Sequence, residues 1–257
     1  MTRLVTRKSR REIESMRRAG RLVAEVLALV ESALRPGVTA AELDALAEAH
    51  IRDSGGIPSF KGYRLDDGSP PFPGSICVSI DDEVVHGLPD ARVIRDGALV
   101  SIDAGAIVDG WHGDAARTFY VGEPPASVAA FIQATRMALM AGIAAAVPGA
   151  RIGDISGAVE DVAAAAGYGI VEECVGHGIG TAMHEAPDVP NFRTRAKGLR
   201  LEPGLCLAIE PMLTLGSPAV GLLDDGWTIV TRDGSLACHF EHTIAIMQDG
   251  PEILTTA

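Results

Sequence analysis

Apolar residues recur with a helical period over the first part of the chain. The stretch opens with Ser9 and Glu12 at the S-x-x-E spacing of a capping box, and it ends at Pro36-Gly37. The same spacing at Thr39 and Glu42 predicts a second helix, which should end near the next Gly-Gly pair. The chain is therefore predicted to begin with two helices.

The same order of elements returns later in the chain. After Pro124 a helical run rich in Ala, Met and Ile reaches Pro148-Gly149, and another predicted helix follows. Strand-like segments punctuated by Gly and Asp-Gly come after each helix pair, which indicates an internal duplication of an α+β half, with two unrelated helical hairpins as the alternative. We expect one catalytic domain over residues 1–257, with halves at about 10–123 and 124–250.

Composition narrows the class of protein. The 257 residues are 47% hydrophobic and 22% charged, which is typical of a soluble globular protein. The net charge of -12 argues against general binding to the phosphate backbone of nucleic acids, with a local basic patch as the alternative. No apolar run approaches the roughly 18 residues of a membrane span, and the N-terminal residues lack the apolar stretch of a signal peptide, so we expect a cytoplasmic protein. The cysteines lie in apolar segments without a CxxC pair, which predicts small buried thiols: Cys77, Cys174, Cys206 and Cys238.

The segment SIDAGAIVDGWHGDAART holds two carboxylates beside a turn signal. Asp109-Gly110 between two strand-like runs predicts a two-residue hairpin. On that register Asp114 lies opposite Gly105, and Asp103 is its diagonal neighbour on the same face, with Cα atoms about 7 to 8 Å apart. Both carboxylates are therefore expected to point the same way.

The residues around Asp103 are apolar, so this face is predicted to be interior. Unpaired carboxylates are costly there and need cations or donors, which a metal ion would supply. The alternative is that one aspartate makes a turn and the other a surface ion pair. Two further acids favour the metal: Glu210 ends an apolar strand before Pro211, and Glu241 shares a strand face with His239 and Thr243.

Six of the seven histidines fall in glycine-punctuated or strand segments. Carboxylates that outnumber imidazoles, with no thiolate, favour a two-metal site with a bridging hydroxide over a structural zinc site. Other motifs are weaker: Gly176–Gly180 breaks the GxGxxG pattern, and the acidic run 81–83 is predicted to be a solvated loop tip. The six histidines are His86, His112, His177, His184, His239 and His242.

Five segments in this order resemble the motifs of the type I methionine aminopeptidases: FPGSICVSIDDEVVHGLP, SIDAGAIVDGWHGDAARTFYVG, CVGHGIGTAMHEAP, AIEPML and FEHT. The resemblance spans nearly the whole chain. It implies the pita-bread fold, an α+β architecture whose two pseudo-symmetric halves form a curved antiparallel sheet covered by helices. It also implies the removal of N-terminal methionine from nascent proteins and peptides, with preference for a small second residue.

The resemblance further implies the roles of individual residues. Asp103 would chelate one of two divalent metal ions (Co²⁺, Mn²⁺, Fe²⁺ or Zn²⁺), Asp114 and Glu241 would bridge both, and His177 and Glu210 would complete the ligand set. Glu210 would also carry a proton. His86 and His184 would contact the substrate amine and the scissile amide. The methionine pocket would be lined by Cys77 and Trp227, with Tyr63, Phe72 and Met183 at its edge.

Departures from the family pattern are local. The segment RLDDGSPP, residues 64–71, replaces a shorter link and is expected to reshape the pocket lip. His239 stands where the family usually has glutamine, and it is expected to support Glu241 or to act as an extra donor. A proline-directed peptidase of the same fold, or a non-catalytic binding relative, is the alternative function. The expected partners are the N-termini of nascent chains, with transient ribosome association, and the expected state is a monomer.

Overall fold

The helices lie where the local sequence signals predict them. The computed structural model describes residues 4–65 and 68–256. In it α1 (Arg10–Ala33) and α2 (Ala40–Asp53) both begin with the predicted capping boxes. α3 (Ala126–Ala145) and α4 (Ile152–Ala166) form the second pair, and α4 ends at Gly167, whose φ of +78° is the left-handed conformation that glycine adopts without strain.

The strands form four antiparallel groups among the described residues, and the α+β class is confirmed. One sheet consists of β1 (Ile57–Pro58), β2 (Ile76–Ile80), β4 (Leu99–Val108) and β5 (Trp111–Tyr120). A second consists of β7 (Gly176–Gly178), β8 (Glu185–Val189), β9 (Cys206–Ile209), β14 (His242–Met247) and β15 (Gly250–Ile253). The smaller groups are β3 (Glu83–Val85) with β11 (Val220–Leu222) and β12 (Ile229–Thr231), and β6 (Gly169–Ile170) with β10 (Met212–Thr214) and β13 (Ala237–His239).

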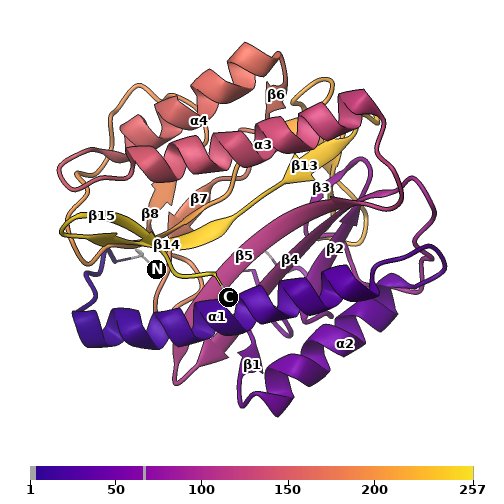
Figure 1. Cartoon of the computed structure of the whole chain (residues 1–257), viewed down its shortest axis with the longest axis horizontal. Helices are drawn as coiled ribbons and strands as arrows, with labels where there is room; N and C mark the ends of the chain where they lie inside the picture. The colour runs from indigo at the N-terminus through magenta and orange to yellow at the C-terminus, as the bar shows by residue number, and fades with distance from the viewer. Residues whose placement is uncertain (1–3, 66–67, 257) are drawn as a thin grey trace.

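The sheets lie between two layers of helices (Figure 1), α1 and α2 on one side and α3 and α4 on the other. Apolar residues of α1 and α2 pack with β2, β4 and β5 in one core, and those of α3 and α4 pack mainly with β9 and β14 in another. The arrangement is what a duplicated half would produce, although the duplication itself and the domain boundaries stay predictions.

Helix α3 is more apolar than the sequence analysis allowed. Among the described residues it is the one helix long and apolar enough to cross a membrane, with a mean hydropathy of 1.5, so the prediction that no apolar run approaches this length is wrong. The helix is 44% buried within the fold, and Phe131, Leu139 and Ile143 belong to the second core. A core helix of a soluble protein can pass the same test, and in α3 the apolar side chains of Met137 and Met140 remain exposed.

A close backbone contact seats α1 on the sheet. A Cβ atom added at Gly113 of β5 would lie 2.6 Å from the backbone nitrogen of Gly20 in α1, so only glycine allows this approach. The contact fixes β5 against the longest helix. The four cysteines are free. Cys77, Cys206 and Cys238 are buried, as predicted, whereas Cys174 is only partly buried, so the prediction is wrong for that residue.

Candidate metal centre

The β4–β5 hairpin has the predicted register. Gly105 pairs with Asp114 and Asp103 with Ala116, so the two carboxylates are diagonal neighbours on one face. The turn residues Asp109 and Gly110 have φ values of 51° and 80°, as a two-residue turn of the primed type requires. A short-range turn signal therefore places the first two acids of the site.

The second half of the chain supplies three more candidate ligands. His177 lies on β7, Glu210 directly follows β9, and Glu241 lies between β13 and β14. The Glu241 N–H donates to the Ala116 carbonyl at 2.9 Å, which joins this connection to β5. Strands from both halves therefore meet at the site.

Two buried threonines hold the halves together beside these ligands. The Asp114 N–H donates to Thr243 Oγ1 at 3.1 Å, and the Thr243 hydroxyl donates back to the Asp114 carbonyl at 2.8 Å. In the opposite direction, the His239 N–H donates to Thr118 Oγ1 at 3.0 Å, and the Thr118 hydroxyl donates to the His239 carbonyl at 2.7 Å. Each threonine satisfies both backbone groups of a residue from the other half.

The candidate ligands form two groups that share one carboxylate. One ligand atom each from Asp114, His177 and Glu241 lie within 4.8 Å of one another, and the same is true of Glu210, His239 and Glu241. His177 Nε2 lies 3.9 Å from Asp114 Oδ2 and 3.6 Å from Glu210 Oε1. Glu241 is thus placed to contact two ions at once.

Four carboxyl groups crowd this buried space. Burial raises the pKa of Asp103 to about 7. Burial, together with the charges of its acidic neighbours, also raises the pKa of Asp114, of Glu210 and of Glu241 well above the usual range. The cluster is electrostatically unfavourable by itself, because like charges this close favour the neutral acids.

Several atoms of the cluster have no hydrogen-bond partner in the described part of the chain. These buried atoms are Asp103 Oδ1, Asp114 Oδ1, Glu241 Oε1 and His239 Nε2. A set of carboxylate oxygens and imidazole nitrogens with free lone pairs fits hard or borderline divalent cations, and such cations also cancel the repulsion. The residues present therefore fit a metal centre.

His177 is prepared for ligation by its other nitrogen. Its Nδ1 lies 2.9 Å from the Gly178 carbonyl, which accepts only, so Nδ1 carries the proton and Nε2 keeps its lone pair. Nε2 is the atom that faces Asp114 and Glu210.

All the residues to which the family resemblance assigns a role line one cavity of about 170 Å³, whereas His239 does not line it. Its walls are mixed: the ligands form one part, and aromatic and sulfur-containing side chains form the other. The residues named from the sequence that line it are Tyr63, Phe72, Cys77, His86, Asp103, Asp114, His177, Met183, His184, Glu210, Trp227 and Glu241.

The apolar wall is held by ring contacts and two hydrogen bonds. Trp227 packs edge-on against Phe72, with ring centroids 5.2 Å apart, and its Nε1 donates to the Pro70 carbonyl at 2.8 Å. The hydroxyl of Tyr63 lies 2.7 Å from His184 Nδ1. Pro70 belongs to segment 64–71, so its described residues do reach the pocket lip, whereas residues 66–67 lie outside the described part of the chain.

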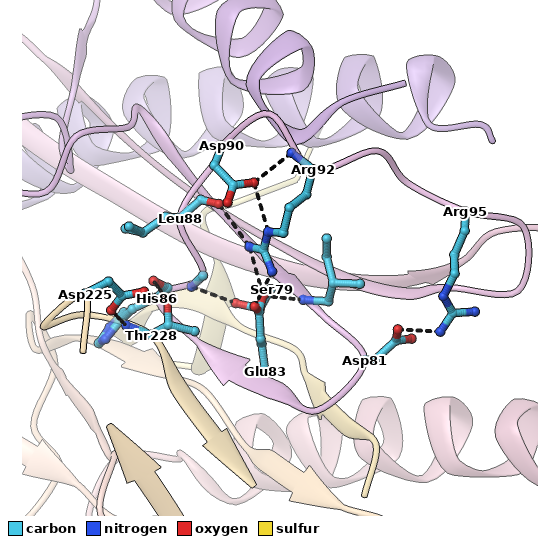
Figure 2. A network of polar contacts seen from close by, with 12 residues as sticks. Ser79, Asp81, Glu83, His86, Leu88, Asp90, Arg92, Arg95, Asp225 and Thr228 are labelled. Carbon is cyan, nitrogen blue, oxygen red and sulfur yellow. Dashed lines mark hydrogen bonds and ion pairs between the residues drawn. The ribbon is translucent and has the colours of Figure 1, made fainter. Parts of the chain in front are cut away.

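His86 occupies a strained position at the cavity. It follows β3 with a φ of +60°, a conformation that residues other than glycine rarely adopt. The Gly87 N–H donates to Ser79 Oγ at 3.1 Å, and Thr228 Oγ1 lies 3.5 Å from the His86 carbonyl (Figure 2). Burial lowers the pKa of His86 to about 4, so its imidazole is neutral at pH 7.

An ion pair beside His86 corrects one prediction. Glu83 is 7% exposed and accepts hydrogen bonds from the Ile80 N–H at 2.8 Å and from the Arg92 guanidinium (Figure 2). Arg92 also donates to the Leu88 carbonyl at 3.2 Å. The prediction of a solvated loop tip over residues 81–83 is therefore wrong for Glu83, because Arg92 supplies the charge that lets it enter the fold.

Sequence reasoning also missed some residues and included others that lie elsewhere. Phe60 and Leu65 line the cavity, and neither stands in a motif that could have indicated it. Among the histidines, His112 hydrogen-bonds to Ser59 and His242 to Thr255, and neither lines the cavity. The segment Gly176–Gly180, set aside as a nucleotide loop, carries the ligand candidate His177.

Comparisons with known proteins agree with this arrangement. The profile of metallopeptidase family M24 matches residues 14–248. The methionine aminopeptidase of Clostridium acetobutylicum is 49% identical over 245 residues, which are 95% of this chain and 96% of that protein. The crystal structure of methionine aminopeptidase from Thermotoga maritima matches with a TM-score of 0.94 and 40% identity, covering 99% of this chain and 100% of that one. Prolidase from Pyrococcus furiosus shares the fold alone, with a TM-score of 0.78 at 21% identity over 98% of this chain and 65% of that one.

Proposed function

The chain belongs to metallopeptidase family M24, and from this premise we propose that it is a metal-dependent aminopeptidase that releases N-terminal methionine from nascent proteins and peptides. It has the pita-bread fold that the sequence resemblance implied. The observation that carries the proposal is one cavity in which a cluster of acidic and imidazole ligands faces an apolar wall.

The ligand cluster suits divalent metal ions, and we propose that it holds two, drawn from Co²⁺, Mn²⁺, Fe²⁺ and Zn²⁺. Asp103, Asp114, His177, Glu210 and Glu241 would hold the ions, with Glu241 shared between the two ligand groups. When bound, such ions supply the Lewis acidity that activates water and polarises a peptide carbonyl.

The remaining polar residues are proposed to handle protons and to orient the substrate. Glu210, which lines the cavity, would take a proton from the attacking water and pass it to the leaving amine. His184 would donate a hydrogen bond to the oxygen on which negative charge develops, with Tyr63 fixing its ring. His86, which also lines the cavity, would contact the free α-amine and the scissile amide, because its neutral imidazole can accept a hydrogen bond.

The apolar wall is proposed to receive the methionine side chain. Cys77 of β2 pairs with Asp103 of β4, so the part of the pocket wall that Cys77 forms lies next to the candidate ligands. Phe72 and Trp227 form the far side, with Met183 also lining it. An enclosed apolar pocket suits a flexible, unbranched side chain, and the crowding near the ligands favours a small second residue.

We further propose that the protein acts as a monomer in the cytoplasm and associates transiently with the ribosome. The monomer is proposed because every residue given a role in binding or catalysis comes from this chain's own sequence and lines the same cavity. The cytoplasmic location and the ribosome association are proposed from the substrate class, because the N-termini of nascent proteins become available during synthesis.

Release of methionine from a Met-Gly peptide, compared with cleavage of an X-Pro peptide, tests the proposed function. The metal-free protein is reloaded with Mn²⁺ or Co²⁺, and products are separated by chromatography. We expect faster cleavage of Met-Gly, and slower cleavage of Met-Leu because its second side chain crowds the ligands. Faster cleavage of the X-Pro peptide would assign a proline-directed peptidase instead.

Two controls accompany this assay. An N-acetylated Met-Gly peptide should remain uncut, because its amine no longer binds, and the metal-free protein should be inactive until it is reloaded. A protein that binds no divalent ion in titration calorimetry and cuts none of the peptides would be a non-catalytic relative.

Replacing Tyr63 by phenylalanine should lower kcat about tenfold with little change in KM. The variant keeps the ring that lies 5.3 Å from the His184 ring but loses the hydroxyl at 2.7 Å from Nδ1, and one hydrogen bond of about 1.4 kcal/mol corresponds to this factor. Steady-state kinetics across pH 5–9 measures the effect. Tyr168→Phe is the matched control, because Tyr168 packs on Phe131 away from the cavity. Equal kcat in Tyr63→Phe and wild type would show that the hydroxyl does not position His184.

A further inference from the structure

His239 lies beneath the cavity, at the end of β13. Its register partner is Met212 of β10, and the residue is 1% exposed. Its backbone N–H and carbonyl are both held by the hydroxyl of Thr118, and Thr118 Oγ1 lies 2.8 Å from Ser101 Oγ. The main chain of His239 is therefore fixed by hydrogen bonds to the opposite half of the protein.

The imidazole of His239 has an unused nitrogen that faces the ligand cluster. Its Nε2 is buried and has no hydrogen-bond partner among residues 4–65 and 68–256. The nearest charged atom is Glu210 Oε2 at 3.7 Å, which is too long for a hydrogen bond. A buried imidazole nitrogen left unpaired in this way costs free energy unless something binds it.

The 3.7 Å separation fits two atoms that bind the same ion. Metal bonds of about 2.1 Å place neighbouring ligand atoms roughly 3.0 to 3.4 Å apart and never more than about 4.2 Å. The Glu210–His239 separation of 3.7 Å lies inside this limit, and Glu241 belongs to the same group, for which 4.8 Å is the upper bound of the separations. Glu210 also lies between two imidazoles, with Oε1 facing His177 Nε2 at 3.6 Å and Oε2 facing His239 Nε2.

We propose that His239 is a sixth protein ligand of the metal centre, binding through Nε2 on the side of Glu210 opposite His177. The inference rests on the proposed metal centre and adds a second imidazole to it. Imidazole favours Zn²⁺ and Co²⁺, whereas carboxylates suit Mn²⁺ as well. The consequence is that this chain prefers Zn²⁺ over Mn²⁺ more strongly than a centre with glutamine at this position.

Titration calorimetry of the metal-free protein with Zn²⁺ and with Mn²⁺ tests the preference. His239→Gln keeps a buried side chain able to hydrogen-bond but removes the nitrogen ligand. We expect its Zn²⁺ affinity to fall about tenfold or more, and its Mn²⁺ affinity to change much less. His112→Gln is the matched control, because His112 is also buried and bonded to Ser59 but lies outside the cavity. It should leave both affinities unchanged.

A second measurement needs no variant and holds even if His239→Gln folds poorly. In the Co²⁺-loaded wild-type protein labelled with ¹⁵N-histidine, each ligating imidazole gives a strongly shifted N–H resonance. Two such resonances are expected, from His177 and His239. A single one, or an unchanged Zn²⁺-to-Mn²⁺ affinity ratio in a folded His239→Gln protein, would overturn the proposal. Wild-type protein that binds no metal would instead contradict the proposed function.

Discussion

Glu241→Gln is expected to lower kcat/KM for a Met-Gly peptide more than about 100-fold. Removing a residue that only supports a metal ligand lowers metal affinity or activity about 10- to 100-fold. Glu241 is itself a candidate ligand and the one carboxylate common to both ligand groups, so its loss should have a larger effect. Glutamine preserves its size and its backbone hydrogen bonds with Ala116, but it removes the negative charge. The variant should also bind fewer divalent ions, as measured by calorimetry on the metal-free protein.

The stability of the same variant separates loss of metal from loss of fold. Burial and neighbouring acids raise the pKa of Glu241, so removing its charge relieves repulsion in the metal-free protein. The melting temperature of metal-free Glu241→Gln should therefore equal or exceed that of the metal-free wild type. Glu252→Gln, which alters a half-exposed acid paired with Arg17, should leave kinetics and metal binding unchanged. If the Glu241→Gln variant had the same kcat/KM as the wild type, Glu241 would not be a ligand of the metal centre.

Lys8→Met should lower the free energy of unfolding by about 3 to 5 kcal/mol. Lys8 Nζ lies 2.7 Å from Glu185 Oε2, with side chains only 3% and 8% exposed, and its loss leaves a buried carboxylate without its cation. Glu185 begins β8 directly after His184, so the pair also anchors one wall of the cavity to the N-terminal segment. Urea unfolding monitored by circular dichroism measures the change.

The pH dependence of this effect has a definite sign. Burial alone would raise the pKa of Glu185, but hydrogen bonds from Lys8 and Thr6 outweigh it and lower that pKa below its usual value of 4.5. The stabilisation is therefore present above about pH 4.5 and lost as the pH falls, so the gap between wild type and Lys8→Met should narrow in acid. Arg7→Met is the matched control: the exposed Arg7–Glu202 pair is worth at most about 1 kcal/mol. If Lys8→Met and Arg7→Met lowered the free energy of unfolding equally, burial of the Lys8–Glu185 pair would not explain its contribution to stability.

The parts of the site that could be predicted from sequence depend on short-range signals. Asp109-Gly110 sets the hairpin, and the hairpin register brings Asp103 and Asp114 to one face. Alternate residues of a strand face the same side, and from this alternation the sequence predicted that His239 faces the site. The side chain does so, because the alternation continues through the residues between β13 and β14. Capping boxes located α1 and α2 for the same reason, since each requires contacts over only three residues.

The rest depends on long-range contacts that periodicity does not encode. That His177 and Glu210 would meet Asp114 followed from the family resemblance, since the pairing of β7 with β9 has no local signature. Glu83 was misjudged because its partner Arg92 lies on another segment, and Leu65 lies on the segment that departs from the family pattern.

The reciprocal bonds of Thr118 and Thr243 have a consequence for how the protein matures. A growing chain that has been made as far as Glu210, just after β9, already contains Asp103, Asp114 and His177, yet it lacks residues 239–243, which bond to Thr118 and Asp114 of β5. Glu241 and the hydrogen bonds of Thr118 and Thr243 between the two halves are present together only after residues 239–243 have been added. Binding of divalent ions by the full set of candidate ligands is therefore expected to require that residues 239–243 have been made.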